Sequence, residues 1–207
     1  VREKTVVTCT PSGFVDDDGD SPSYTFAWTV NGSPAGSSAT LDGSAFDKGD
    51  ELVCTVTPSD GTEDGEPVSS AAVTVANTAP VATSVTLSDL TPSTTDSLTA
   101  TVAGVGDDDG DSVSLEYVWS VDSTAVRRVT RAGLTDTLDA SAYAKGDTVQ
   151  VAVTPTDGDD RGTTIVSGTA TVQNTLPVVT ALALSPDPAY TTTPLTATPT
   201  ASDADGD

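Results

Sequence analysis

The sequence contains no histidine and no methionine, and it has only two cysteines and two tryptophans in 207 residues. Without histidine, the chain lacks the side chain that most often transfers protons near neutral pH and that most often binds zinc or copper. It also lacks a nucleophile elbow and a glycine-rich phosphate loop. We therefore expect a protein that is not an enzyme.

Positive charge is scarce as well. Eight Lys and Arg stand against 31 Asp and Glu, which gives a formal net charge of −23. Nucleic acids and anionic membrane surfaces are bound through clustered Lys and Arg, so this balance argues against both as partners. No stretch approaches the roughly eighteen consecutive apolar residues of a transmembrane helix. We expect no membrane insertion in this segment.

What the chain does have is a short acidic run that occurs three times. Residues 16–20 and 107–111 both read Asp-Asp-Asp-Gly-Asp, and residues 203–207 read Asp-Ala-Asp-Gly-Asp. Self-similarity at a fixed period is the signature of a tandem array. Further matched segments are residues 24–28 and 115–119, 48–50 and 145–147, 57–61 and 154–158, and 77–80 and 174–177.

Between the acidic runs, apolar and polar residues alternate as they do in half-buried β-strands. Residues 24–30 and 113–121 show this alternation most clearly, and we count roughly seven such strands in each repeat. No helical period is long enough to supply the crossovers that parallel strands need. The strands are therefore expected to be mainly antiparallel and stacked as a sandwich.

The two cysteines sharpen this expectation. Cys9 and Cys54 both lie on the inward-facing parity of their strands, with Trp28 between them in the sequence. This is the Cys, Trp, Cys arrangement of an immunoglobulin domain. In the next repeat Ala100 and Val151 replace both thiols together. We predict a Cys9–Cys54 disulfide and an oxidising compartment, the alternative being two buried free thiols.

With these residues, the chain resembles bacterial extracellular tandem immunoglobulin-like repeats of the PKD and cadherin-like kind. The motifs that carry the resemblance are the acidic turn followed by Tyr117-x-Trp119, the corner at 143–147, the Asp157-Gly158 turn and the Asn-Thr-x-Pro linker. The resemblance covers nearly the whole chain. It implies a spacer, adhesin or surface-structure role, with an extracellular or cell-surface location.

The predicted fold is all-β, with tandem antiparallel immunoglobulin-like β-sandwiches arranged as a linear rod. Residues 1–77 are expected to form a repeat that lacks its first strand. Residues 78–174 are expected to form a complete repeat, and residues 175–207 the opening strands of a third.

The acidic runs are candidate metal sites. Like charges crowded into five residues repel one another unless a cation is bound, and calcium takes six to eight oxygen ligands in flexible geometry. The alternative is that Asp-Gly turns are good hairpin chemistry and stay hydrated without metal. We predict calcium as cofactor, with Asp157 and the linker residue Asn77 joining the central run. The candidate ligands are Asp16, Asp18, Asp20, Asp60, Asp107, Asp109, Asp111, Asp157, Asp203, Asp205, Asp207 and Asn77.

Three of the eight basic residues gather in one segment. The segment 125–132 is about six residues longer than its counterpart in the first repeat, and it carries Arg127, Arg128 and Arg131. One interpretation is a solvated loop. The other is a contact for an acidic neighbouring subunit.

We expect the chain to associate end to end with copies of itself. The first repeat lacks the segment that corresponds to residues 80–95, whereas residues 177–193 are an extra copy of it. Either the array is continuous, which we favour, or one subunit donates residues 178–184 to the next. In both cases Val178, Leu182 and Leu184 are expected to be buried against a partial or neighbouring unit.

The function predicted from these features is structural. A calcium-stiffened rod or filament is expected, as in a surface fibre, an adhesin stalk or a cell-surface layer, with a cell-surface ligand at a distal tip. The alternative is a carbohydrate-binding accessory module of a secreted polysaccharide-degrading enzyme. Such a module needs an aromatic platform. Both tryptophans are predicted in the core, and Tyr190 is isolated.

Overall fold

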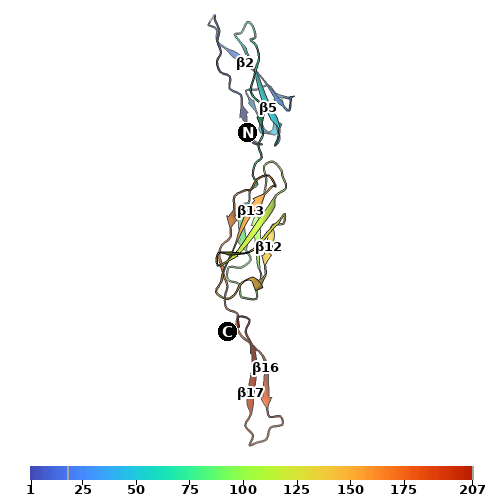
Figure 1. Cartoon of the computed structure of the whole chain (residues 1–207), viewed down its shortest axis with the longest axis vertical. Coiled ribbons are helices and arrows are strands. Elements are labelled where there is room, and N and C mark those ends of the chain that lie inside the picture. The colour runs from blue at the N-terminus through green and yellow to red at the C-terminus, as the bar shows by residue number, and fades with distance from the viewer. Residues whose placement is uncertain (18, 207) are drawn as a thin grey trace. The chain divides into compact units, whose positions relative to one another are not determined.

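Figure 1 shows the computed structural model of the chain, which describes residues 1–17 and 19–206. The chain folds into two compact units. The first consists of Val1–Pro80 together with two acidic loops, Gly106–Val113 and Asp157–Arg161. The second consists of Val81–Val105, Ser114–Thr156 and the residues from Gly162 onward. Among the described residues, no helix has the length and apolar character that crossing a bilayer requires.

The first unit contains two antiparallel sheets. The larger has the order β3 (Ser33–Gly36), β2 (Ser23–Val30), β5 (Glu51–Ser59) and β6 (Val68–Ser69), and β7 (Val73–Thr74) also pairs with β5. The smaller pairs β1 (Val7–Thr8) with β4 (Thr40–Leu41), which is followed by the 3₁₀ turn η1 (Gly43–Ala45). The core between them is formed by Trp28, Leu41, Phe46, Leu52, Cys54 and Val75.

The second unit repeats this plan with longer strands. One sheet has the order β11 (Thr124–Arg131), β10 (Ser114–Val121), β13 (Thr148–Thr156) and β14 (Ile165–Val166), and β15 (Ala170–Thr171) also pairs with β13. The other has the order β12 (Thr135–Leu138), β9 (Leu98–Ala103) and β8 (Ser84–Leu87), and η2 (Ala140–Ala142) follows β12. The alternation of the sequence places Leu115, Tyr117 and Trp119 fully inside.

The remaining strands, β16 (Val178–Ser185) and β17 (Thr196–Ser202), form a hairpin of their own. Every residue of β16 is exposed, and the exposed fractions of Val178, Leu182 and Leu184 are 58%, 65% and 63%. The expected burial of these three residues against a partial unit is therefore wrong within this chain. The physical reason is that a lone two-stranded sheet has no opposite layer to cover its apolar face. Burial against another chain stays a prediction.

The sequence repeat makes the strands of the two units correspond. In order, β1 to β7 match β9 to β15, and the hairpin strands β16 and β17 match β8 and β9. The fold is thus all-β, with tandem antiparallel β-sandwich domains, as the sequence predicts.

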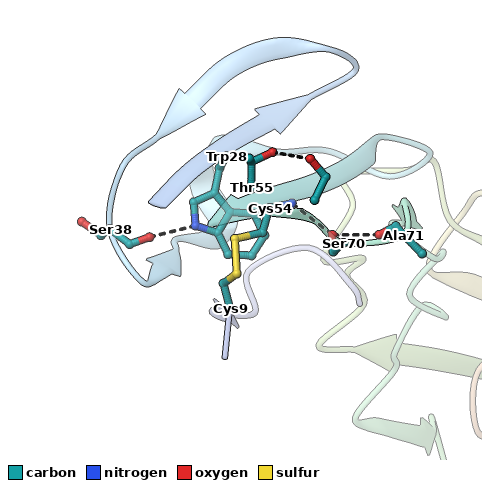
Figure 2. The surroundings of a disulfide bond; sticks show 8 residues. Cys9, Trp28, Ser38, Cys54, Thr55, Ser70 and Ala71 are labelled. Carbon is teal, nitrogen blue, oxygen red and sulfur yellow. Dashed lines mark hydrogen bonds between the residues drawn. A yellow bond between two sulfur atoms is a disulfide. The ribbon is translucent and has the colours of Figure 1, made fainter. Parts of the chain in front are cut away.

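The predicted disulfide is present in the first unit. Cys9 and Cys54 are bonded across the sandwich, with their Cα atoms 6.4 Å apart. Figure 2 shows the bond beside the Trp28 ring, whose Nε1 donates a 2.9 Å hydrogen bond to the carbonyl of Ser38. The chain therefore has the Cys, Trp, Cys core that the spacing indicated.

In the second unit, the tryptophan N–H donates to a buried carboxylate and not to a backbone carbonyl. Trp119 Nε1 donates a 2.8 Å hydrogen bond to Asp136, whose side chain is 1% exposed. Arg127 and Arg131 form ion pairs of 3.1 and 2.7 Å with the same carboxylate. Burial alone would raise the pKa of Asp136, but hydrogen bonds from Arg127 and Trp119 and the charge of Arg131 outweigh it and lower the pKa.

The arginine-rich segment is thus a strand with partners inside its own unit. It forms β11, and Arg128 pairs with Glu116 of β10 at 2.6 Å. These intrachain pairs account for all three arginines, which the sequence interpretation did not foresee. Their contact with a neighbouring subunit stays a prediction.

Candidate metal centre

The central acidic run forms a half-buried cluster in the first compact unit. Asp107, Asp109 and Asp111 each offer one carboxylate oxygen, and these oxygens lie within 4.8 Å of one another. Asp107 organises the turn, because its Oδ1 accepts the backbone N–H groups of Asp109 at 2.8 Å and Asp111 at 3.3 Å. Gly110 has a φ of +78° at the point where the turn reverses, a conformation that suits glycine.

The linker of the Asn-Thr-x-Pro motif is tied to this cluster. The backbone N–H of Thr78 donates a 2.5 Å hydrogen bond to Asp109 Oδ2. The Asn77 amide donates to Asp157 at 3.0 Å and to Asp160 at 3.1 Å. The linker and both acidic loops are therefore connected through hydrogen bonds.

Three oxygens of the cluster are buried without a hydrogen-bond donor. Asp107 Oδ2, Asp109 Oδ1 and Thr78 Oγ1 are inaccessible to solvent and have no partner among the described residues. A buried carboxylate oxygen without a partner loses its hydration and gains no compensating hydrogen bond. A hard cation would supply the missing interaction, since calcium takes oxygen ligands and binds carboxylates in particular. The residues present thus fit a bound cation.

A lysine also reaches the cluster. Lys48 Nζ lies 2.5 Å from Asp111 Oδ2 and 3.0 Å from Asp159 Oδ2, and it donates to the Asn77 side chain at 3.0 Å. Hydrogen bonds to Asp111 and Asp159 raise the pKa of Lys48, so its ammonium stays charged. Sequence reasoning did not include Lys48 in the site. The sequence contained a signal for this lysine, because the Lys-Gly-Asp segment at residues 48–50 recurs at residues 145–147.

The hydrogen bonds also favour the ionised form of Asp157. Donation from the Asn77 amide, and then from the backbone N–H of Asp160, holds the pKa of the Asp157 carboxyl below its ordinary value. Its Oδ1 accepts the N–H groups of Asp159 at 2.8 Å and Asp160 at 2.7 Å. Asp157 therefore serves mainly to shape its loop and to hold the linker.

Replacing Lys48 by Gln is expected to lower the melting temperature of the first unit in chelator, because the carboxylates of Asp111 and Asp159 lose their counter-ion. The decrease in melting temperature should be smaller at high salt, because salt screens the repulsion between these carboxylates. Lys4→Gln is the matched control, since Lys4 pairs with Asp108 at 2.8 Å but both side chains are more than 60% exposed. Thermal unfolding at low and high ionic strength measures both variants. Equal melting temperatures for the two variants would contradict this role.

The first acidic run is also closed by its leading aspartate, but its described carboxylates do not form such a group. Asp16 Oδ1 accepts the N–H groups of Gly19 at 2.8 Å and Asp20 at 3.2 Å, and Asp60 organises its own turn. Asp18 lies outside the described residues. Within the described part of the chain, the only three carboxylates that converge are those of the central run. A metal at Asp16, Asp20 and Asp60 stays a prediction.

The third run repeats part of the central arrangement within the second unit. Asp203 Oδ1 accepts the N–H of Asp205 at 2.8 Å, and Asp205 accepts the N–H of Thr175 at 2.6 Å and the hydroxyl of Thr94. The Thr94 hydroxyl, together with the Thr175 N–H, lowers the pKa of Asp205. Asp207 lies outside the described residues, so a metal at this run stays a prediction.

Neither tryptophan is available as a platform for sugars in the described structure. The exposed fractions of Trp28 and Trp119 are 4% and 0%, as their predicted core positions required. Tyr190 is 71% exposed in the loop between β16 and β17.

Known proteins similar to this chain are found among solved structures. No protein-family model matches the sequence, and no curated protein matches it. Among solved structures, a two-domain fibronectin type III segment of chicken tenascin is similar over 83% of this chain and 95% of its own, with a TM-score of 0.45 and 13% identity. The FN1–FN3 domains of chicken CNTN1 are similar over 89% and 68%, with a TM-score of 0.40 and 16% identity. The fibronectin(III)-like modules of Clostridium thermocellum CbhA are similar over 72% and 77%, with a TM-score of 0.33 and 17% identity.

Proposed function

We propose that this chain is a structural, non-catalytic repeat protein that works outside the cell or on its surface, as a stalk or fibre segment of the PKD and cadherin-like kind. Two features support the proposal. Tandem sandwich domains suit a spacer, and a disulfide persists in oxidising compartments. We further propose that the central acidic cluster binds calcium and thereby stiffens the linker.

The observation that carries the calcium site is the set of buried oxygens without donors at Asp107, Asp109 and Thr78. Together with Asp111, these residues would hold the ion. The ion would neutralise the crowded carboxylates and give the linker a further attachment to the acidic loop. Because the Thr78 backbone is already hydrogen bonded to Asp109, holding Asp109 also holds the linker.

Calcium is expected to raise the melting temperature of the first unit, because a ligand that binds only the folded state stabilises it. Extracellular modules bind calcium with dissociation constants of roughly 10⁻⁴–10⁻³ M. At about 10 mM calcium, the free energy of unfolding should therefore rise by about 1–3 kcal/mol. Differential scanning calorimetry in calcium and in chelator measures the shift, and isothermal titration measures binding directly.

Two single substitutions in the same acidic run distinguish calcium binding at a specific site from a general effect of lost charge. Asp109→Asn retains an oxygen for the Thr78 N–H but removes the anionic Oδ1, so it should abolish the calcium shift. Asp108→Asn removes the same charge from a side chain that is 65% exposed and paired with Lys4, so it should retain most of the shift. An equal response of the two variants, or no shift in the unmodified chain, would sink the calcium proposal.

A further inference from the structure

Lys48 joins three separate segments of the first unit at one point. Its Nζ lies 2.5 Å from Asp111 Oδ2 in one acidic loop and 3.0 Å from Asp159 Oδ2 in the other. It also donates a 3.0 Å hydrogen bond to Asn77 Oδ1 in the linker. Carboxylate and amide oxygens are ligands that calcium also takes. The lysine ammonium therefore occupies a position whose chemistry suits a cation.

The backbone holds Lys48 at this position. The Lys48 N–H donates a 2.7 Å hydrogen bond to Glu3 Oε1, and the N–H of Gly49 donates to the Val75 carbonyl at 2.9 Å. The side chains of Lys48 and Asp111 are only 28% and 33% exposed. Partial burial reduces screening by water, so this ion pair is stronger than one on the open surface.

The second unit repeats the contact between lysine and linker. Lys145 Nζ donates a 3.0 Å hydrogen bond to Asn174 Oδ1, as Lys48 does to Asn77. Each lysine stands in a Lys-Gly-Asp segment, and each asparagine opens an Asn-Thr-x-Pro linker. The contact is therefore part of the repeat and is specified by its sequence.

Lys48 and the proposed calcium ion would share one ligand. In the proposed site, Asp111 binds the ion together with Asp107, Asp109 and Thr78. Lys48 already pairs with one oxygen of Asp111 at 2.5 Å. Calcium binds oxygens at roughly 2.4 Å, so an ion in contact with Asp111 would lie within about 7 Å of Lys48 Nζ.

Two positive charges at this separation repel each other. For a divalent ion and an ammonium about 5–7 Å apart, Coulomb repulsion corresponds to about a tenfold change in the dissociation constant, even at the dielectric constant of water. Physiological salt screens this repulsion only in part, because the Debye length is about 8 Å. Lys48 therefore stabilises the cluster without an ion and opposes the ion itself.

We propose that Lys48 is a tethered counter-ion that takes the place of calcium in the ion-free cluster and weakens calcium binding to it. This inference rests on the proposed calcium site. The two acidic loops carry seven aspartates, and Lys48 neutralises part of their charge while it connects the loops to the linker. Calcium would do the same, so each cation reduces the stabilisation that the other provides. Such coupling is reciprocal.

The alternative role for Lys48 is to position Asp111 and Asn77 for the ion. The two roles predict opposite results when the lysine is removed. Loss of a positioning residue would weaken calcium binding, whereas loss of a competing counter-ion strengthens it.

Isothermal titration of the full chain with calcium chloride separates the two roles. Lys48→Met removes the charge and supplies no oxygen ligand, so its dissociation constant should be about tenfold lower than that of the unmodified chain. Lys48→Arg retains the charge and should bind calcium like the unmodified chain. Lys4→Met is the matched control, because it removes a lysine that pairs with Asp108 of the same acidic run, through side chains that are 63% and 65% exposed. Its dissociation constant should change by less than about threefold.

Thermal unfolding gives a second measurement of the same coupling. In chelator, Lys48→Met should melt below the unmodified chain, and most of this difference should disappear in saturating calcium. A difference of the same size in chelator and in calcium would contradict the coupling.

The outcomes distinguish this role from the calcium site on which it rests. If the unmodified chain binds calcium and Lys48→Met binds it equally or more weakly, the role of Lys48 is overturned and the site remains. Equal tightening by Lys4→Met would show a general charge effect and would also overturn the role. Binding by Lys48→Met alone would support the role but contradict calcium binding by the unmodified chain. If neither protein binds calcium, both the site and the role of Lys48 are wrong.

Discussion

Reduction of the Cys9–Cys54 bond is expected to destabilise the first unit by about 4 kcal/mol and to leave the second unit unchanged. The bond closes a sequence separation of 45 residues, and the chain-entropy model gives this magnitude for a loop of that size. The first unit depends on the bond more than a fully covered sandwich would, because several of its apolar residues are only half-buried. Hydrogen exchange monitored by mass spectrometry reports the two units separately.

The second unit supplies a matched variant for this experiment. Cys9→Ala with Cys54→Val converts the first unit to the pair that the second unit has at Ala100 and Val151. The double variant should resemble the reduced protein and should not respond to reductant. If reductant raised hydrogen exchange equally in both units, or changed the double variant, the effect would not come from this disulfide.

Replacing Asp136 by Ala is expected to destabilise the second unit by about 3 kcal/mol. The substitution leaves the buried Trp119 N–H without an acceptor and separates Arg127 and Arg131 from their shared carboxylate. Removing one partner of a buried ion pair costs about 3–5 kcal/mol. The lower end applies, because the arginine side chains are about 40% exposed and can be hydrated. Urea denaturation measures the change.

Arg128→Ala provides the control, because its pair with Glu116 lies on the surface of the same sheet and should contribute little. Equal destabilisation by Arg128→Ala and Asp136→Ala would contradict the role assigned to the buried carboxylate.

The lowered pKa of Asp136 adds a pH test of the same role. Its contribution is fully present above the unfolded-state pKa of roughly 3.9 and is lost as pH falls through the folded-state pKa. The difference in unfolding free energy between the unmodified chain and Asp136→Asn should therefore become smaller as the pH falls.

Local patterns in the sequence were sufficient to predict the fold and the turn of the central acidic run. Alternating apolar residues predicted the strands that carry Trp28 and Trp119, because strand periodicity depends only on which face is buried. The inward parity of Cys9 and Cys54 predicted their bond in the same way. The acidic run at Asp107 predicted its own turn, since that turn is closed by hydrogen bonds between near neighbours.

Contacts between segments far apart in the chain were decided only by the tertiary structure. Neither the approach of Lys48 to Asp111 nor the pairing of Arg127 with Asp136 follows from a local pattern, because each joins side chains from different strands or loops. The exposure of Leu182 depends likewise on whether an opposite sheet is present. The sequence by itself determined which residues face inward. The tertiary structure decided which charges meet and which apolar faces stay uncovered, because both depend on the packing of segments that local periodicity does not relate.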